Sequence, residues 1–433
     1  MLAFEFVIVL LAIYLGARLG SIAIGFAGGF GVLALAIFCQ IPPGNIPFDV
    51  IQIIMAVIAG IAAMQVAGGM DYLVSLAEKL LRKHPKQITY LAPVVTYVMT
   101  IFAGTGHTAF STMPVITEVA KGQGIRPSRP LSIGVVASQI AITASPISAA
   151  VVFMAAEMEK YGVSYLTLLG IWLSTTFVAV MITAFVTNFL GKELKDDPIY
   201  QDRLAKGLVS TKPIDKIVIK KGAKLSVAIF LVGVVAVMLY ATAISDTVKL
   251  IENPILGRDQ AIIVFMLSVA TFITLLCDVK PENVLNASTF KSGMSACVCV
   301  LGVAWLGSTF VEANKELIQT SAGDLLREYP WMLAVALFFA ATLLYSQAAT
   351  AKALIPTAMA IGVTPLTAIA SFAAVSALFV LPTYPTLLAA VEMDDTGSTR
   401  IGKYVFNHSF LIPGILAIVL AVILGFIVGG IVL

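Results

Sequence analysis

Two polar breaks in apolar segments contain the side chains best suited to binding a small anion. The first reads GTGHTAFSTMP from Gly104 to Pro114, and the second reads SQAATAKALIP from Ser346 to Pro356. Both breaks supply hydroxyl groups, and a helix that begins after a break turns its free amides and positive dipole end toward it. We therefore predict carboxylate binding by Thr105, Gly106, His107 and Thr108 in the first break, and by Ser346, Gln347, Thr350 and Lys352 in the second.

Lys352 is the most informative of these residues. It is the one charged residue between Trp331 and Val391, and a charge at membrane depth is costly unless it faces a cavity or a partner. We predict that Lys352 meets an anionic substrate. Two alternatives stay open, namely a lysine stem that reaches the membrane interface and an ion pair with a carboxylate such as Asp394 or Asp395. Two helix N-termini and one lysine suit a small molecule with two carboxylates.

A long apolar segment with a proline-containing interruption follows each break. The interruptions are TASPIS at residues 143–148 and LPTYPT at residues 381–386. Proline removes a backbone donor and frees a carbonyl group one turn earlier, and inside a bilayer that group needs protein, water or ligand as its partner. The predicted substrate site therefore also includes Ser145, Pro146, Ser148, Thr383 and Thr386. At the end of the second segment, Asp394, Asp395 and Thr396 are candidates for coupling or gating, or form a solvated helix end.

The elements that position these residues are apolar enough to lie in a membrane. Of the 433 residues, 59% are hydrophobic and 12% charged, and the mean hydropathy is +0.98, whereas soluble domains are about 45–50% apolar and about 25% charged. The lipid bilayer is the expected surrounding, and a net charge of +3 gives no reason to expect nucleic acid. Scattered histidines and cysteines indicate no metal or cofactor. Without an HExxH motif or paired catalytic acids, we do not expect an enzyme.

The predicted fold is an all-α polytopic membrane protein built from two inverted repeats, residues 1–191 and 225–433. Residues 192–224 form a linker whose nine basic and five acidic residues place it in the cytoplasm. Basic residues flank the first break at Arg82, Lys83, Lys86, Lys121, Arg126 and Arg129, whereas the second has only Arg327, offset by Glu328. Opposite membrane orientations would produce this difference. We expect the apolar N-terminus to be a retained first helix rather than a cleaved signal peptide.

Several long stretches resemble the anaerobic C4-dicarboxylate transporter (Dcu) family, most closely its DcuA branch. They are LGARLGSIAIGFAGGFGVL (15–33), NIPFDVIQIIMAVIAGIAAMQVAGGMDYLV (45–74), QIAITASPISAAVV (139–152), YSQAATAKALIP (345–356) and LFVLPTYPTLLAAVEMDDTGSTRIGKYVFNH (378–408). One position differs, because the first break carries His107 where some members of that branch have Asn. The sister DcuB branch has His there.

The resemblance implies a protein of the bacterial inner membrane that serves anaerobic respiration by exchanging fumarate, malate or L-aspartate for succinate. It also implies an elevator-type fold similar to the ion-transporter superfamily, assembled as a homodimer. Re-entrant hairpins would lie at 86–121 and 331–362 and broken helices at 130–158 and 363–393, leaving about ten true crossings. Two alternative functions stay open: a sodium- or proton-coupled dicarboxylate symporter, and a dicarboxylate-sensing co-regulator of a membrane sensor kinase.

Overall fold

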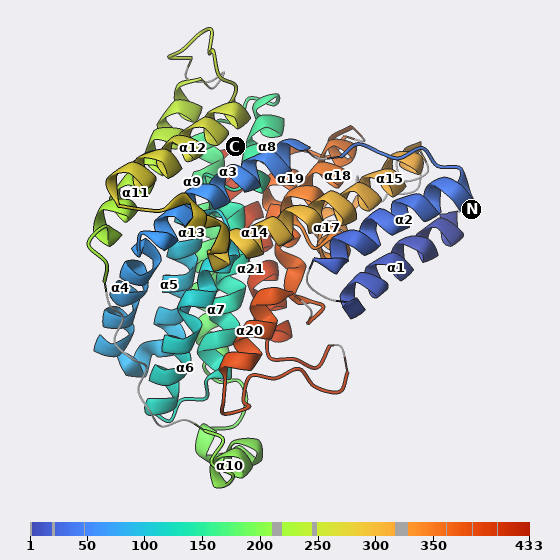
Figure 1. Cartoon of the computed structure of the whole chain (residues 1–433). Helices are drawn as coiled ribbons and strands as arrows, with labels where there is room; N and C mark the ends of the chain where they lie inside the picture. The colour runs from blue at the N-terminus through green and yellow to red at the C-terminus, as the bar shows by residue number, and fades with distance from the viewer. Residues whose placement is uncertain are drawn as a thin grey trace.

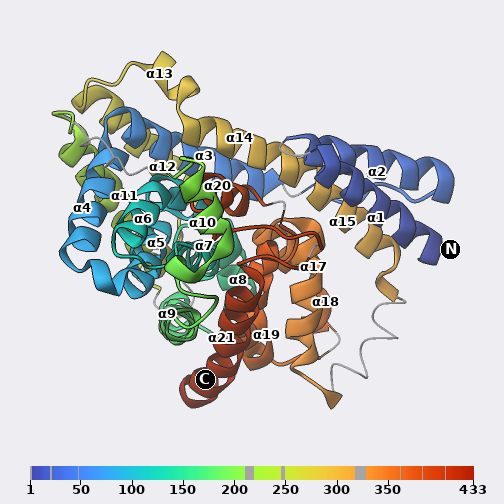
Figure 2. The same cartoon turned by 90° about the horizontal axis from the view of Figure 1, so that it is seen from below.

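The computed structural model describes residues 2–19, 22–46, 48–209, 219–244, 249–316, 328–360, 362–382, 384–404 and 406–433. Thr383, Arg327 and part of the predicted linker lie outside these residues, and so does the side chain of His107. Within the described chain, helices joined by turns and by longer loops make up the fold (Figures 1 and 2).

The helices of the first half are α1 (Leu2–Leu19), α2 (Ala23–Cys39), α3 (Phe48–Val66), α4 (Gly69–Lys83), η1 (Pro85–Gln87), α5 (Ile88–Ala103), η2 (Gly106–Ser111), α6 (Met113–Gly122), α7 (Ser128–Ile140), η3 (Ala141–Ala144), α8 (Ala149–Glu159), α9 (Tyr165–Thr187), η4 (Leu194–Asp196) and α10 (Pro198–Ala205). Those of the second half are α11 (Ala223–Ala243), α12 (Arg258–Leu276), α13 (Pro281–Asn286), α14 (Ser288–Cys299), η5 (Val300–Ala304), α15 (Trp305–Ala313), α17 (Met332–Leu344), α18 (Gln347–Ala360), α19 (Pro365–Ser371), η6 (Phe372–Phe379), α20 (Pro385–Met393) and α21 (Leu411–Val432).

Six helices in the described chain are long and apolar enough to cross a bilayer, or seven if α3 and α4, bent by 74°, form one span. A crossing needs about 20 residues, and other apolar helices are shorter, including those at residues 4–16, 25–39 and 332–342. Fewer single helices therefore meet the length requirement than the sequence led us to expect. The class of fold is nevertheless confirmed, because a polytopic membrane protein accounts for both the helices and their composition.

The surface of the bundle is apolar in the way a lipid-facing surface must be. Large side chains such as Val232, Leu239 and Leu275 are more than half exposed on α11 and α12. A soluble protein rarely leaves so much contiguous apolar surface open to water. In contrast, the segment from Ser128 to Ala155, which contains α7, η3 and α8, is almost entirely buried. The first interrupted segment is thus at the centre of the protein.

The packing places α3 and α14 together on one side of this centre. In Figure 2 they run side by side, with α8, α17 and α18 across from them. The turn η5, which continues α14, crosses α2 very closely. A Cβ atom on Gly302 of η5 would lie 1.8 Å from the carbonyl oxygen of Gly25 on α2. Small residues permit such contacts between membrane helices. This contact, at the π-helical turn η5, fixes the position of α14 relative to the first two helices.

Candidate functional site

A cavity of about 410 Å³ lies where the two breaks and the two interruptions meet. The first break contributes Gly104 and Thr105, and the second contributes residues 345–348. The interruptions contribute residues such as Ile147 and Tyr384, while α3 adds an apolar wall at positions 53, 54, 57 and 58. Cavities of this size hold small organic ligands. Segments far apart in the sequence therefore form one site.

The first break turns at Gly104, which ends α5 in the left-handed conformation with φ of +67°. Its amide donates to the carbonyl of Thr100 at 2.8 Å. A Cβ atom at this position would lie 3.0 Å from the Ile147 side chain. Glycine is therefore favoured by both the turn and the close approach of the first interruption.

Hydrogen bonds within the protein satisfy the backbone that the first interruption exposes. Pro146 has no amide to donate to Ile142, and the hydroxyl of Ser148 donates to that carbonyl instead, at 2.7 Å. The carbonyl of Pro146 accepts from the Tyr165 hydroxyl at 2.6 Å, and Ser145 donates to Ile101 at 2.6 Å. Ser145, Pro146 and Ser148 thus hold the cavity wall in shape, and none of the three is among the residues that line the cavity.

The second break is anchored to the helices that precede the two interruptions and to Tyr384 of the second interruption. Gln347 donates through Nε2 to the carbonyl of Gln139 at 2.7 Å and to the hydroxyl of Ser376 at 3.3 Å. Tyr345, in the left-handed conformation with φ of 52°, stacks on Tyr384 with ring centroids 6.5 Å apart. The second break therefore sits against the ends of α7 and η6 rather than projecting freely.

Two helix N-termini open onto the cavity. Ala149 and Ala150 begin α8, and Gln347 and Ala348 begin α18, and all four residues line the cavity. The first amides of a helix have no acceptor within the helix and carry a positive partial charge. Ser148 caps α8 by accepting from Val151 at 3.2 Å, which leaves the amides ahead of it available. Two such ends in one cavity favour the binding of carboxylate groups.

The third polar contribution comes from α14, which the sequence analysis missed. Lys291, Ser295 and Cys299 line the cavity at intervals of four residues, so they lie on one face of α14. The sequence analysis assigns no role in binding to this region. The lysine–serine spacing at i and i+4 is a signal in the sequence, but it becomes specific only once the packing of α14 is known.

The predicted substrate residues therefore divide into groups. Thr105, Ser346 and Gln347 line the cavity. Others lie in the packing behind it: Gly106 and Thr108 are buried, Thr350 donates to the Ser346 carbonyl at 2.7 Å, and Thr386 accepts from Gln139 at 3.2 Å. Thr383 and the His107 side chain are outside the described part of the chain.

Lys352 does not line the cavity in this structure. Its ammonium group forms an ion pair with Asp49, near the start of α3, and lies 5.6 Å from the centre of the Phe153 ring. The structure contains an ion pair of the kind that the second alternative described, with Asp49 as the carboxylate partner. The two carboxylates named as examples, Asp394 and Asp395, have other partners. Contact between Lys352 and a substrate stays a prediction.

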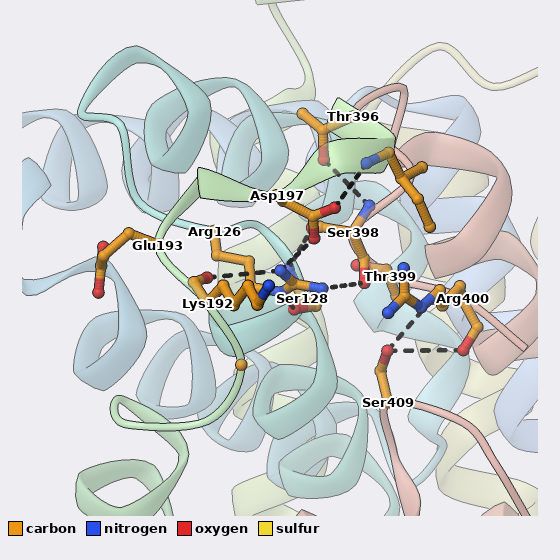
Figure 3. A network of polar contacts seen from close by, with 12 residues as sticks. Arg126, Ser128, Lys192, Glu193, Asp197, Thr396, Ser398, Thr399, Arg400 and Ser409 are labelled. Carbon is orange, nitrogen blue, oxygen red and sulfur yellow. Dashed lines mark hydrogen bonds and ion pairs between the residues drawn. The ribbon is translucent and has the colours of Figure 1, made fainter. Parts of the chain in front are cut away.

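The predicted coupling or gating residues lie in the loop that follows α20 and do not line the cavity. Figure 3 shows one of them, Thr396, among the polar contacts of this loop. Asp394 is buried and accepts from the amide and hydroxyl of Thr396 at 3.0 and 2.5 Å. Asp395 forms an ion pair with Lys121 at 2.8 Å. Their hydrogen bonds organise the loop after α20, and a role in coupling or gating stays a prediction.

Arg126 and Asp197 join this loop to the segment between the two halves of the chain. Their side chains form a buried ion pair, and Arg126 also donates to the hydroxyl of Ser128 at 2.8 Å. It further contacts the carbonyl of Ser398 at 3.4 Å. Burial raises the pKa of Asp197, but the Ile199 amide and the Arg126 guanidinium outweigh it, so that this pKa lies below its usual value.

Comparison with known proteins identifies the family. A family model described as anaerobic C4-dicarboxylate membrane transporter matches residues 1–433. The chain belongs to this family. It is 66% identical over 433 residues to the C4-dicarboxylate transporter DcuA of Wolinella succinogenes, with 100% of each chain covered. It is 61% identical over 430 residues to DcuA of Escherichia coli K12, covering 99% of both.

A more distant relative is the anaerobic C4-dicarboxylate transporter DcuB of Escherichia coli O6:H1, 36% identical over 436 residues, with 98% of this chain and 97% of the relative covered. Because the family is one of membrane transporters, the chain is a multi-pass membrane transporter and not an enzyme. Its bacterial relatives are in keeping with the inner membrane. The predicted resemblance to this family, and to its DcuA members in particular, is confirmed.

Proposed function

We propose that this protein exchanges C4-dicarboxylates such as fumarate, malate or L-aspartate for succinate across the bacterial inner membrane. The observation that carries the proposal is the cavity between the two breaks, where two helix N-termini and Lys291 converge. Those groups match a short molecule with a negative charge at each end. The relatives are C4-dicarboxylate transporters by name, which supports the same class of substrate.

Alternating access is the proposed mechanism. One wall of the cavity belongs to α3 and α14, and the other belongs to the breaks and interruptions. A movement of the second wall past the first, as in an elevator-type transporter with inverted repeats, would carry a bound anion from one side to the other. Exchange of fumarate or malate for succinate replaces one dianion by another and moves no net charge, so that cycle needs no accompanying ion. L-Aspartate also carries an ammonium group, so its exchange for succinate moves one net charge.

A sodium-coupled symporter on the same fold is the nearest alternative. It would use backbone carbonyls freed at the interruptions as cation ligands. At the first interruption, the carbonyls of Ile142 and Pro146 already accept hydrogen bonds from Ser148 and Tyr165. This favours exchange over sodium symport, because these carbonyls have partners without a cation.

The direct test is an exchange assay in liposomes that contain the purified protein. Labelled L-aspartate or fumarate outside should enter rapidly when succinate is inside, and only slowly when the liposomes contain buffer alone. An electrical potential across the membrane should have little effect on the exchange of fumarate for succinate, because both are dianions. Equal uptake into buffer-loaded liposomes, driven by a sodium or proton gradient, would contradict the proposal and support symport.

The role of Lys352 can be tested by comparing a variant of this residue with a variant of its ion-pair partner, Asp49. Replacing Lys352 by glutamine should lower exchange by about tenfold or more if the ammonium group meets substrate during the cycle, whereas Asp49→Asn should leave the rate near that of the wild type. Both variants break the same ion pair, so Asp49→Asn is the matched control. Equal losses in the two variants, with recovery in the double variant, would show that only the pair matters.

A further inference from the structure

We infer that Lys291 is the residue that makes this cavity selective for substrates with two ionised carboxylates over analogues with one. The inference rests on the proposed function and assigns the charge selectivity of that site to one side chain. Lys291 is on α14, away from both breaks, and the pattern of breaks and interruptions in the sequence gives no indication of it.

The position of Lys291 is fixed by the start of its helix. Gln65 on α3 donates to the hydroxyl of Ser288 at 2.7 Å and accepts from the amide of Thr289 at 3.1 Å. A Cβ atom on Gly293 would lie 2.1 Å from Ile58, so α14 and α3 are in tight contact one turn further on. Because α14 is anchored on both sides of Lys291, this exposed lysine lines the cavity from a rigid element.

Lys291 supplies the positively charged side chain among the described residues of the cavity lining. Among the described residues that line the cavity, Lys291 is the charged one. The described ion pairs do not include it, whereas Lys352 is held by Asp49. The wall that α3 adds to the same cavity is apolar at Ile54 and Ile58. A ligand that fills the cavity would shield the Lys291 ammonium group from water, and a carboxylate would then be attracted more strongly than in bulk water.

The helix N-termini and the lysine lie on different walls. Ala149 of α8 and Ala348 of α18 belong to the wall formed by the breaks and interruptions, and Lys291 belongs to the wall of α3 and α14. A dicarboxylate that spans the cavity would place one end at the helix amides and the other at Lys291. An analogue whose second carboxylate is an amide keeps the first interaction and loses the second.

The test compares succinate with its monoamide, succinamate, in the same liposomes. In wild-type protein, succinate should inhibit uptake of labelled fumarate at a much lower concentration than succinamate. In Lys291→Gln, the half-inhibitory concentration of succinate should rise roughly tenfold or more, as for loss of a charged hydrogen bond, while that of succinamate changes little. Lys291→Arg should retain most of the preference. Lys280→Gln, at an exposed lysine before α13, is the control and should match the wild type.

The outcomes separate this inference from the proposed function. If the wild type exchanges dicarboxylates and Lys291→Gln keeps the full preference for succinate, the inference is wrong and the proposed function stands. If the wild type does not exchange dicarboxylates, the proposed function is wrong. Should Lys291→Gln prove unstable, Lys291→Met and the protection of purified protein from thermal unfolding by each ligand give the same comparison. Equal protection of wild type and Lys291→Met by succinate would overturn the inference.

Discussion

Replacing Arg126 by methionine is expected to lower the free energy of unfolding by about 3–5 kcal/mol, because it leaves the carboxylate of Asp197 buried without its cation. The two side chains are only 7% and 4% exposed. Arg126 also holds Ser128 and the carbonyl of Ser398, so the same change releases the loop after α20 (Figure 3). The measurement is the thermal unfolding of the purified protein in detergent.

The matched control is a similar pair on the surface. Lys206 and Asp202 form an ion pair at 2.7 Å, and their side chains are 62% and 59% exposed. Pairs of this kind contribute about 0–1 kcal/mol, so Asp202→Asn should shift the unfolding midpoint very little. Similar shifts of the unfolding midpoint in Arg126→Met and Asp202→Asn would mean that the buried ion pair contributes no more to stability than the exposed one.

The pH dependence of this contribution follows from the pKa of Asp197. Folding lowers that pKa, so the stabilisation is fully present above the unfolded value, about 3.9, and is lost as the pH falls through the folded value. Wild-type stability should therefore decline at the acid end of the range, and Asp197→Asn should lose this part of the decline.

The sequence predicts the breaks and interruptions well because their causes are local. Gly104 takes a conformation that other residues avoid, and Pro146 removes a backbone donor wherever it stands. The partner that replaces the lost donor is also close, since Ser148 follows two residues later. Such features are visible in one sequence, and the structure adds that they gather at one cavity.

The sequence analysis did not predict the surroundings of Lys352 and Lys291, because these are set by residues far away in the sequence. Asp49 is 303 positions from Lys352, and their pairing requires the relative placement of α3 and α18. Lys291 begins an apolar span, where a lysine usually reaches toward the membrane interface. Its direction is decided by the contacts of α14 with α3 and α2. Only the packing of these helices distinguishes a lysine that lines a cavity from one at an interface.

A substitution that fills the cavity is expected to abolish most transport while leaving the stability of the protein nearly unchanged. Ala348 lines the cavity at the start of α18 and is 6% exposed. In Ala348→Phe, the ring would occupy space that is otherwise available to a ligand, so exchange should fall by roughly a hundredfold or more, the scale of loss that misplaced substrates show. Ala348→Leu should have a smaller effect. Ile415→Phe, on the lipid-facing surface of α21, is the control and should transport normally.

The stability of Ala348→Phe should stay close to that of the wild type, because a side chain that fills a cavity adds contacts instead of displacing packed atoms. Succinate should protect the wild type from thermal unfolding and fail to protect the variant, since protection requires binding to the folded state. This combination identifies the cavity as the binding site. Normal exchange by Ala348→Phe would place the substrate elsewhere, and a large drop in its unfolding midpoint would mean that the ring had displaced packed atoms instead of filling the cavity.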